Sequence, residues 1–542
     1  MAGRARILAI IGIPVLLLVG VILAVSLLGG GDESGGGGSS SGGKGGGTIT
    51  LGMDQDPDTL DPQKTNLDPQ ILLYLGDPLV TKTPGGKIVP ALAESWKVSE
   101  DGKVYTFKLK NGVKFHDGTP LDAEAVKASI ERALDPKTKA GIAASLFAGI
   151  ESVEAPSKDT VEVKLAQPSS IFLLNISAPP AAIINVEAAN RMGDEFGRKP
   201  VLSGPYEVES WKSGEQVVIK RNPDYRWAPD YVKDESAYLD TITFRIIPDL
   251  STQVSALRSG ELQAIRVPPV NVGEIRGSDE FRTFENLRQG IGTYIEMNTQ
   301  RAPFDDPAVR EAISHAVDKE AIIDSVYRGQ GEPACGPLPS TIPGYWEGAC
   351  DAAPGHDPAK AKELLSGAGW NPGQDGTLQK NGQPLEFTLL TQAGNREWSQ
   401  SAQLIQQQLK GVGVKMEIQS LELGALIEKV GAGESQANFL GYSYTNPDIL
   451  YQFFHSSSIE AGLNTTRIQS DELDAVLEKM RSAADAAERD RFARQAQETL
   501  IDEAAWVPIV VNQDYWAARQ EVRGAEVGAD GSWYLQNASV SE

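Results

Sequence analysis

The chain has 542 residues and a formal net charge of −23, and 41% of its residues are hydrophobic. A chain of this length is too long for one ordinary hydrophobic core, so we expect roughly two to four domains. The hydrophobic fraction is that of a globular protein, which excludes a disordered polypeptide for the body of the chain. The acidic balance argues against a nucleic-acid partner, because contacts to the phosphate backbone need clustered Lys and Arg side chains.

An apolar segment stands near the N-terminus. Arg4 and Arg6 precede residues 7–28, which carry no charged side chain. This segment is long enough to cross a bilayer as a helix with its positive flank inside, whereas a secretory signal peptide has a shorter apolar core. Both a retained membrane anchor and a removed signal fit the sequence, and either places the body outside the cytoplasm, in the periplasm or at the cell surface. Residues 29–47 are rich in Gly and Ser and are expected to form a flexible linker.

The first half of the body is expected to mix strands and helices. It begins with a predicted strand over residues 48–53. A second strand over residues 104–109 lies between two turn sequences and predicts a hairpin, and Asp122 is expected to cap the helix that follows. Residues 238–247 predict another strand, followed by a helix that ends at Gly260.

Residues 292–326 predict a strand and two helices. The strand covers residues 292–298 and ends at an Arg-Ala-Pro-Phe corner. Asp306 then supplies an N-cap carboxylate, and Pro307 stands at the first helical position, where no amide donor is needed. Asp318 is expected to cap the second helix.

Strands and helices alternate through the rest of the chain, which predicts an α/β architecture. The expected strands cover residues 386–390, 412–418, 437–444 and 506–511, and the expected helices begin at residue 358, cover residues 396–410 and form a pair within residues 473–500. The strand over residues 506–511 is expected to be the last.

Cys335 and Cys350 are the only cysteines, and they stand in a loop rich in Pro and Gly. In an exported protein, a pair of cysteines favours a disulfide over a metal site, which would need further Cys or His residues nearby. The two cysteines are therefore predicted to form a disulfide. The four aspartates between residues 54 and 61 lack the glycine and the glutamate of a calcium loop, so no metal site is expected.

No catalytic site is evident in the sequence, which has no strand-to-helix elbow of the type G-x-S-x-G, no H-E-x-x-H helix and no Cys/His cluster. A hydrolase needs a nucleophile with an activating base, and no such pair is indicated. We therefore expect a protein that is not an enzyme and needs no cofactor. The four histidines lie far apart and are each expected to be structural: His116, His315, His356 and His455.

Residues 297–322, MNTQRAPFDDPAVREAISHAVDKEAI, resemble the segment that opens the second lobe of family 5 extracellular solute-binding proteins. These proteins are the peptide- and nickel-type receptors of ABC importers. Residues 88–119 and 238–265 also resemble the family, as do Gly204-Pro205-Tyr206 and Arg221-Asn222-Pro223-Asp224-Tyr225. The resemblance covers about residues 48–542.

The resemblance implies a fold. This is the α/β, two-lobed periplasmic-binding-protein fold of class II, in its large three-subdomain type, with mixed sheets and a ligand cleft between the lobes. After an N-terminal segment at residues 1–28 and the linker, the first lobe would comprise residues 48–90, 205–291 and 506–542, its inserted subdomain residues 91–204, and the second lobe residues 292–505. The chain would cross between the lobes near residues 294–298 and 504–508.

The resemblance also implies a function. An extracytoplasmic substrate-binding subunit of an ABC importer captures a peptide or other small solute between its two lobes and delivers it to the permease subunits in the membrane. We expect a monomer that is held at the membrane by its N-terminal segment. In this family a lipidated cysteine commonly ends that segment, but Gly30 stands at that position here. A secreted hydrolase and a surface receptor or adhesin remain the alternatives.

Residues 439–448, FLGYSYTNPD, resemble the glycine-aromatic strand end at the family's ligand cleft. In the family's peptide binders, an acidic residue about four positions after that glycine captures the ligand's α-ammonium group, and Thr445 occupies this position here. The residues predicted to line the cleft are Tyr442, Tyr444, Thr445, Asn446, Gln392, Asn395 and Trp398. Such aromatic and neutral polar side chains favour an uncharged or internally polar solute over a free amine. The alternative is that the two tyrosines belong to the core and the other residues to a surface turn.

Overall fold

The computed structural model describes residues 47–65, 70–233, 238–442, 446–460, 462–483 and 485–541. Residues 45–542 form one compact unit. The apolar segment at residues 7–28 and most of the linker lie outside the described residues. Within the described part of the chain, no helix is long and apolar enough to cross a membrane.

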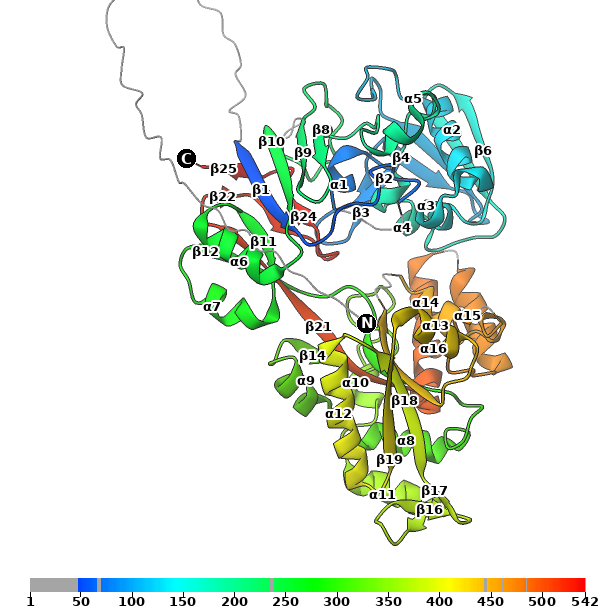
Figure 1. Ribbon diagram of the computed structural model, residues 1–542. Coiled ribbons are helices and arrows are strands. Elements are labelled where there is room, and N and C mark those ends of the chain that lie inside the picture. The colour runs from blue at the N-terminus through cyan, green and yellow to red at the C-terminus, as the bar shows by residue number, and fades with distance from the viewer. Residues whose placement is uncertain are drawn as a thin grey trace, which may run out of the picture. The chain divides into compact units, whose positions relative to one another are not determined.

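A twelve-stranded mixed sheet is the framework of the body (Figure 1). Across the sheet the strands are, in order, β19 (Lys415–Leu421), β18 (Glu386–Gln392), β20 (Ala437–Tyr442), β13 (Gly292–Met297), β21 (Trp506–Arg519), β11 (Ala264–Val267), β1 (Thr48–Met53), β10 (Thr241–Ile246), β9 (Gln216–Arg221) and β8 (Tyr206–Lys212). Two further strands, β12 (Phe281–Leu287) and β14 (Gly331–Pro333), also pair with β21.

Strand β21 joins two groups of strands, and Figure 1 shows it as the long strand that continues from one group into the other. Its N-terminal part pairs with β13 and β14, and its C-terminal part pairs with β11 and β12. We call β8, β9, β10, β1, β11 and β12 the first strand group, and β13, β14, β18, β19 and β20 the second. The chain passes between the groups twice, at residues 288–291 and within β21 at residues 512–514, a few residues away from the crossings expected near residues 294–298 and 504–508.

Local sequence explains the elements of the first strand group. Strand β1 runs parallel to β10 and buries Ile49 and Leu51 in a core shared with Phe244. The Asp249 side chain accepts a hydrogen bond from the backbone of residue 252 and so begins α6 (Leu250–Ser259), and Gly260 ends that helix in the left-handed conformation, with φ 81°. These bounds confirm the predicted strand and helix before residue 260. The short helices η4 (Pro269–Asn271) and α7 (Val272–Arg276) follow β11.

A separate four-stranded antiparallel sheet lies between β1 and β8 in the chain. Its strands are, in order, β4 (Ala93–Val98), β5 (Val104–Leu109), β7 (Thr160–Leu165) and β6 (Ile150–Ser157). Helix α2 (Ala123–Leu134) packs against β6 and β7, and the Asp122 side chain caps it, as predicted. The smaller elements of this region are α1 (Leu72–Leu75), β2 (Val80–Lys82), β3 (Ile88–Pro90), η1 (Pro136–Thr138), α3 (Gly141–Leu146), α4 (Phe172–Asn175), η2 (Pro179–Ala181), α5 (Val186–Met192) and η3 (Gly193–Gly197).

Helices pack against the strands of the second group. Asp306 caps α8 (Pro307–Ala316) and Asp318 caps α9 (Lys319–Val326), so both predicted helix starts are confirmed. Strand β18 runs parallel to both β19 and β20, and the connections between them contain α12 (Arg396–Gly411) and α13 (Leu423–Gly431). The remaining elements are α10 (Ala349–Ala352), α11 (Pro358–Gly367), β15 (Asn371–Pro372), β16 (Leu378–Lys380), β17 (Gln383–Pro384), α14 (Ile449–Phe454), η5 (Ser456–Ser458), α15 (Asp471–Arg481) and α16 (Ala486–Glu503).

Two predicted strand boundaries in the second half of the chain are wrong. The strand expected at residues 412–418 begins only at Lys415, because Gly413 takes a positive φ of 85° in the turn after α12. The strand expected to end at residue 511 continues to Arg519, because pairing with β11 and β12 extends it. It is also not the last strand, since β22 (Val522–Arg523), β23 (Glu526–Val527), β24 (Trp533–Tyr534) and β25 (Ser539–Val540) follow.

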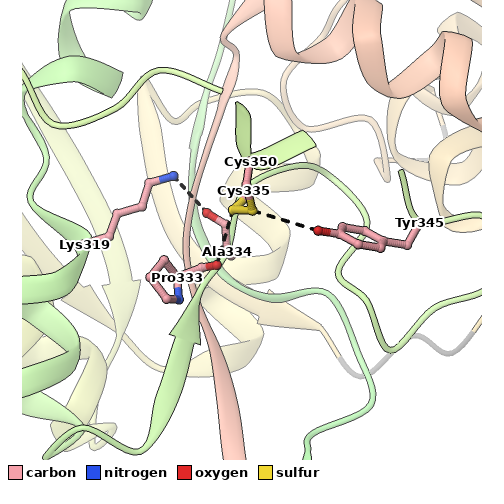
Figure 2. Close-up of a disulfide and its surroundings, with 6 residues drawn as sticks. All are labelled: Lys319, Pro333, Ala334, Cys335, Tyr345 and Cys350. Atoms are coloured by element: carbon pink, nitrogen blue, oxygen red, sulfur yellow. Dashed lines mark hydrogen bonds between the residues drawn. A yellow bond between two sulfur atoms is a disulfide. The ribbon is translucent and has the colours of Figure 1, made fainter. Parts of the chain in front are cut away.

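The predicted disulfide is present. Cys335 and Cys350 are joined with their Cα atoms 4.7 Å apart, and they close a loop with a sequence separation of 15. Figure 2 shows the bond directly after β14, beside Lys319, whose Nζ donates to the carbonyl oxygen of Ala334 at 2.9 Å. The disulfide therefore ties the end of β14, a strand paired with β21, to α10.

Candidate functional site

A pocket of about 460 Å³ lies where β21 passes from one strand group to the other. The first group contributes Arg266 and Val267 from β11, and residues 268–270 at the start of η4 follow them in the pocket wall. The second contributes Thr293 from β13, the segment after α9, the start of α12 and the end of β20. The pocket therefore has walls from both strand groups, and both chain crossings between the groups line it.

An ion-pair triad lies at these crossings. Arg288 donates from Nε to Oδ2 of Asp514 at 2.9 Å and from Nη2 to Oδ1 at 2.6 Å, and Arg266 donates from Nη2 to Oδ1 at 2.8 Å. Burial alone would raise the pKa of Asp514, but the hydrogen bond from Arg288 and the charges of both arginines lower it below its ordinary value. Asp514 is therefore an ionised carboxylate shared by two guanidinium groups.

The start of α12 forms part of the pocket wall. The Asn395 side chain caps this helix by accepting a hydrogen bond from the backbone N–H of Trp398 at 3.0 Å. The Trp398 ring packs edge-on against Phe439, with the ring centroids 6.3 Å apart. A Cβ atom at Gly441 would lie 2.7 Å from the carbonyl oxygen of Gly292 and 3.2 Å from the Trp398 ring, so glycine is what permits this close approach.

The structure brings some of the predicted cleft residues together. Asn395, Trp398 and Tyr442 line the pocket, whereas Gln392 and Asn446 do not. Tyr444 and Thr445 lie outside the described residues, so their place in the cleft stays a prediction.

Two residues near the end of β20 have partners within the protein. The ring of Tyr442 packs against Phe453 with a centroid distance of 4.5 Å and against Tyr294 with one of 5.9 Å. This tyrosine therefore packs against core aromatic residues and also lines the pocket. Asp448 is buried and pairs with Arg481, whose Nε lies 2.9 Å from its Oδ1. A carboxylate already paired in this way is a poor partner for a ligand's ammonium group.

Sequence reasoning missed the charged lining of the pocket. Six charged side chains line it: Arg266, Arg288, Arg328, Arg396, Glu397 and Asp514. They come from five separate segments of the chain, which the sheet topology brings together. No local sequence motif therefore predicts this charged lining.

The histidines make local contacts. His116 is partly buried beside residues 202–204: its Nε2 is 3.1 Å from the carbonyl oxygen of Gly204, and its Nδ1 accepts from the backbone of Leu202 at 3.4 Å. His315 Nδ1 is 2.8 Å from the carbonyl oxygen of Gly355. Among the described residues there is no group of three or more His, Cys, Asp or Glu side chains that could hold a metal ion.

Comparison with known proteins identifies the family. The model of the bacterial extracellular solute-binding proteins, family 5 (middle), matches residues 87–461. The chain belongs to this family. It is 32% identical over 466 residues to the glutathione-binding protein GsiB of Escherichia coli strain K12, an alignment that covers 84% of this chain and 86% of that protein.

Solved structures agree with this assignment. The oligopeptide-binding protein AppA of Bacillus subtilis, solved with a nonapeptide, matches with a TM-score of 0.71 at 26% identity and covers 92% of this chain and all of its own. NikA of Brucella suis, solved with Fe(III)-EDTA, matches with a TM-score of 0.79 at 25% identity and covers 91% of this chain and all of its own. The protein is an extracytoplasmic substrate-binding protein of an ABC transporter with the two-lobed α/β fold of its family. The expected family, fold and function are thereby confirmed, and no relative named here is a hydrolase or an adhesin.

Proposed function

We propose that this family 5 solute-binding protein captures a small peptide or peptide-like solute in the pocket at the β21 crossing. The observation that carries the proposal is that both strand groups line one pocket at the two chain crossings. Its volume of about 460 Å³ lies within the range of roughly 300–1,000 Å³ that is usual for small-molecule sites. The names of GsiB and AppA, which bind glutathione and oligopeptides, support a peptide-like solute.

Binding in such a pocket couples the solute to a change of conformation. A solute that touches both strand groups stabilises the arrangement in which the groups lie closest, because only that arrangement makes all of its contacts. The membrane permease would recognise this closed form. Binding and delivery need no bond-breaking chemistry, so we propose that the protein is not an enzyme.

The assembly around this function is also part of the proposal. The first lobe consists of residues 48–90, 205–291 and 506–542, its inserted subdomain of residues 91–204, and the second lobe of residues 292–505. The chain acts as a monomer. Residues 7–28 hold it at the cytoplasmic membrane through the Gly/Ser-rich linker, whose length leaves the body free to reach the permease.

Binding measurements with matched variants test the site. A panel of di- and tripeptides, oligosaccharides and metal chelates is screened by thermal shift, and the tightest solute is titrated by calorimetry. Trp398→Ala removes a side chain that lines the pocket on the side of the second strand group. Val270→Asp changes a 56% exposed residue that lines the pocket on the side of the first strand group. Val98→Asp changes a 43% exposed valine outside the pocket and serves as the control.

The proposal predicts that both pocket variants weaken binding of the tightest solute by roughly tenfold or more, since each alters a contact from a different strand group. The control variant should bind like the unmodified protein. Unchanged affinity in both pocket variants would remove this pocket from the solute site, and a panel without any bound solute would contradict the proposed function itself.

A further inference from the structure

We infer that the solute is a short peptide with an acidic side chain, and this inference rests on the proposed function of the pocket. Four arginines but only two acidic residues line the pocket, in a chain whose formal net charge is −23. The charge balance at the pocket is therefore the reverse of the balance of the whole chain. A local excess of one charge within a concave site raises the concentration of ligands of opposite charge there.

Part of this positive charge is already neutralised. Arg266 and Arg288 share the single carboxylate of Asp514, which leaves one positive charge over in the triad. The bidentate pairing holds Arg288 in place, with its guanidinium plane matched to the carboxylate. The triad therefore forms a fixed, weakly cationic wall of the pocket.

Arg328 and Arg396 differ from the triad, because neither guanidinium group has a hydrogen bond or an ion pair with any other residue that the structure describes. Both side chains are exposed and line the pocket. A guanidinium group presents a planar fork of donors that fits a carboxylate in two parallel hydrogen bonds. Two such groups in one pocket, neither paired with a described residue, are suited to a solute with two carboxylates.

The position of Arg396 in its helix supports a role in binding. It is the first residue of the 16-residue helix α12, directly after the Asn395 cap. A positive side chain at a helix N-terminus is unfavourable for the helix itself, because the unpaired N–H groups there already carry partial positive charge. The same N–H groups and the Arg396 side chain would act together on an anionic solute group.

The backbone conformation of Arg328 also supports a role in binding. This residue has φ 57°, a left-handed conformation that costs free energy for a side chain with a Cβ atom and that glycine adopts readily. Gly329, the next residue, also has a positive φ of 72°. Strained backbone conformations of this kind cluster at ligand sites, and here the strained residue is one that lines the pocket.

Glu397 supplies the complementary charge. It lines the pocket, and its charge is among those that raise the pKa of Arg288 against the opposing effect of burial. A peptide has one ammonium group and one terminal carboxylate, and an acidic side chain adds a second carboxylate. Pairing of the ammonium with Glu397 and of the two carboxylates with Arg328 and Arg396 would leave none of the three side chains without a partner.

The test compares two tripeptides that differ in one group. Ala-Glu-Ala and Ala-Gln-Ala have the same length and nearly the same shape, but only the first has a side-chain carboxylate. Calorimetric titration of each into the full protein should show at least roughly tenfold tighter binding of Ala-Glu-Ala, since a hydrogen bond to a charged group is stronger than one between neutral groups. Added salt should reduce this preference, because it screens the charges.

Variants assign the preference to the pocket. Arg328→Gln and Arg396→Gln each should weaken Ala-Glu-Ala by roughly tenfold, and at least one should weaken Ala-Gln-Ala less, which identifies the arginine that holds the acidic side chain. Arg523→Gln is the matched control, since Arg523 is exposed and lies outside the pocket. Thermal unfolding verifies that all three variants are folded.

Three outcomes would overturn the inference. The first is that the unmodified protein binds Ala-Gln-Ala as tightly as Ala-Glu-Ala or more tightly, and the second is that neither peptide binds. The third is that Arg328→Gln and Arg396→Gln each leave the preference for Ala-Glu-Ala over Ala-Gln-Ala unchanged. Binding of another panel solute that Trp398→Ala and Val270→Asp weaken would then retain the pocket as the solute site and reject only the acidic peptide.

Discussion

Arg288 and Asp514 join the two chain segments that pass between the strand groups. Arg288 lies in the segment between β12 and β13, Asp514 lies in β21, and the guanidinium group of the first contacts both carboxylate oxygens of the second. Both residues also line the pocket. A movement of one strand group relative to the other must therefore either carry this pair along or break it, so the pair links the geometry of the crossings to the shape of the pocket.

Asp514→Asn should destabilise the protein by about 1–3 kcal/mol, because it removes the charge that compensates Arg266 and Arg288. The side chain of Asp514 is only 12% exposed, whereas both arginines are more than 40% exposed, so water partly replaces the lost partner for them. Urea unfolding at pH 7 measures the change. Asp324→Asn, on an exposed residue of α9 outside the pocket, is the control, and equal stability of the two variants would contradict the account of the triad.

Glu296 should make the protein less stable as the pH rises. This side chain in β13 is fully buried beside Asn438, and burial raises its pKa to about 7 although its hydrogen bonds oppose the change. In the unfolded chain a glutamate titrates near pH 4.3. Between these values the folded protein holds a proton that the unfolded chain has lost, so stability falls as the pH rises through this window and is lowest above the folded pKa.

Glu296→Gln tests this relation, since glutamine cannot ionise and can still accept from Asn438. Relative to the variant, the unmodified protein should lose on the order of 2 kcal/mol of stability between pH 5 and pH 8. Asp77, whose pKa burial also raises to about 7, contributes equally to both proteins and cancels in the difference. Parallel stability curves in urea unfolding across this pH range would show that Glu296 is not the titrating group.

Loss of the disulfide should destabilise the protein by about 3 kcal/mol, which is the chain-entropy value for a loop of this length. The double variant Cys335→Ser, Cys350→Ser and the reduced unmodified protein should show the same loss in urea unfolding. Peptide mapping without reductant gives the direct check. Two free thiols in exported protein would refute the bond.

Solute binding should make the body more compact. A solute held by both strand groups favours their close approach, so the radius of gyration from small-angle scattering should fall when the tightest panel solute is added. A panel solute that does not bind serves as the control. An unchanged radius with a solute of proven affinity would count against closure.

Local sequence patterns predicted the elements that have strong end signals. Asp306, Asp318 and Asp122 cap the helices they were expected to cap, because a carboxylate at this position satisfies free N–H groups whatever the surroundings are. The end of β21 was not predictable in this way. Its polar stretch Asn512-Gln513-Asp514 looks like the end of a strand, yet pairing with β11 and β12 continues it to Arg519.

The residues of the candidate site also divide into those that the local sequence predicts and those that it does not. Asn395 and Trp398 could be predicted because they stand at a strand-to-helix turn next to the glycine of β20, and both line the pocket. Arg266, Arg288 and Arg328 could not, since each looks like an ordinary surface arginine until the sheet topology places them around one cavity. The prediction of an uncharged or internally polar solute used only the neutral residues, and the charged lining is why we propose an acidic peptide.

The most direct test of the central claim is a crystal structure of the protein with the tightest panel solute. We expect the solute to occupy the pocket at the β21 crossing, in contact with Trp398 on one wall and with the segment from Val267 to Val270 on the other. A solute bound elsewhere, with this pocket free of it, would contradict the account.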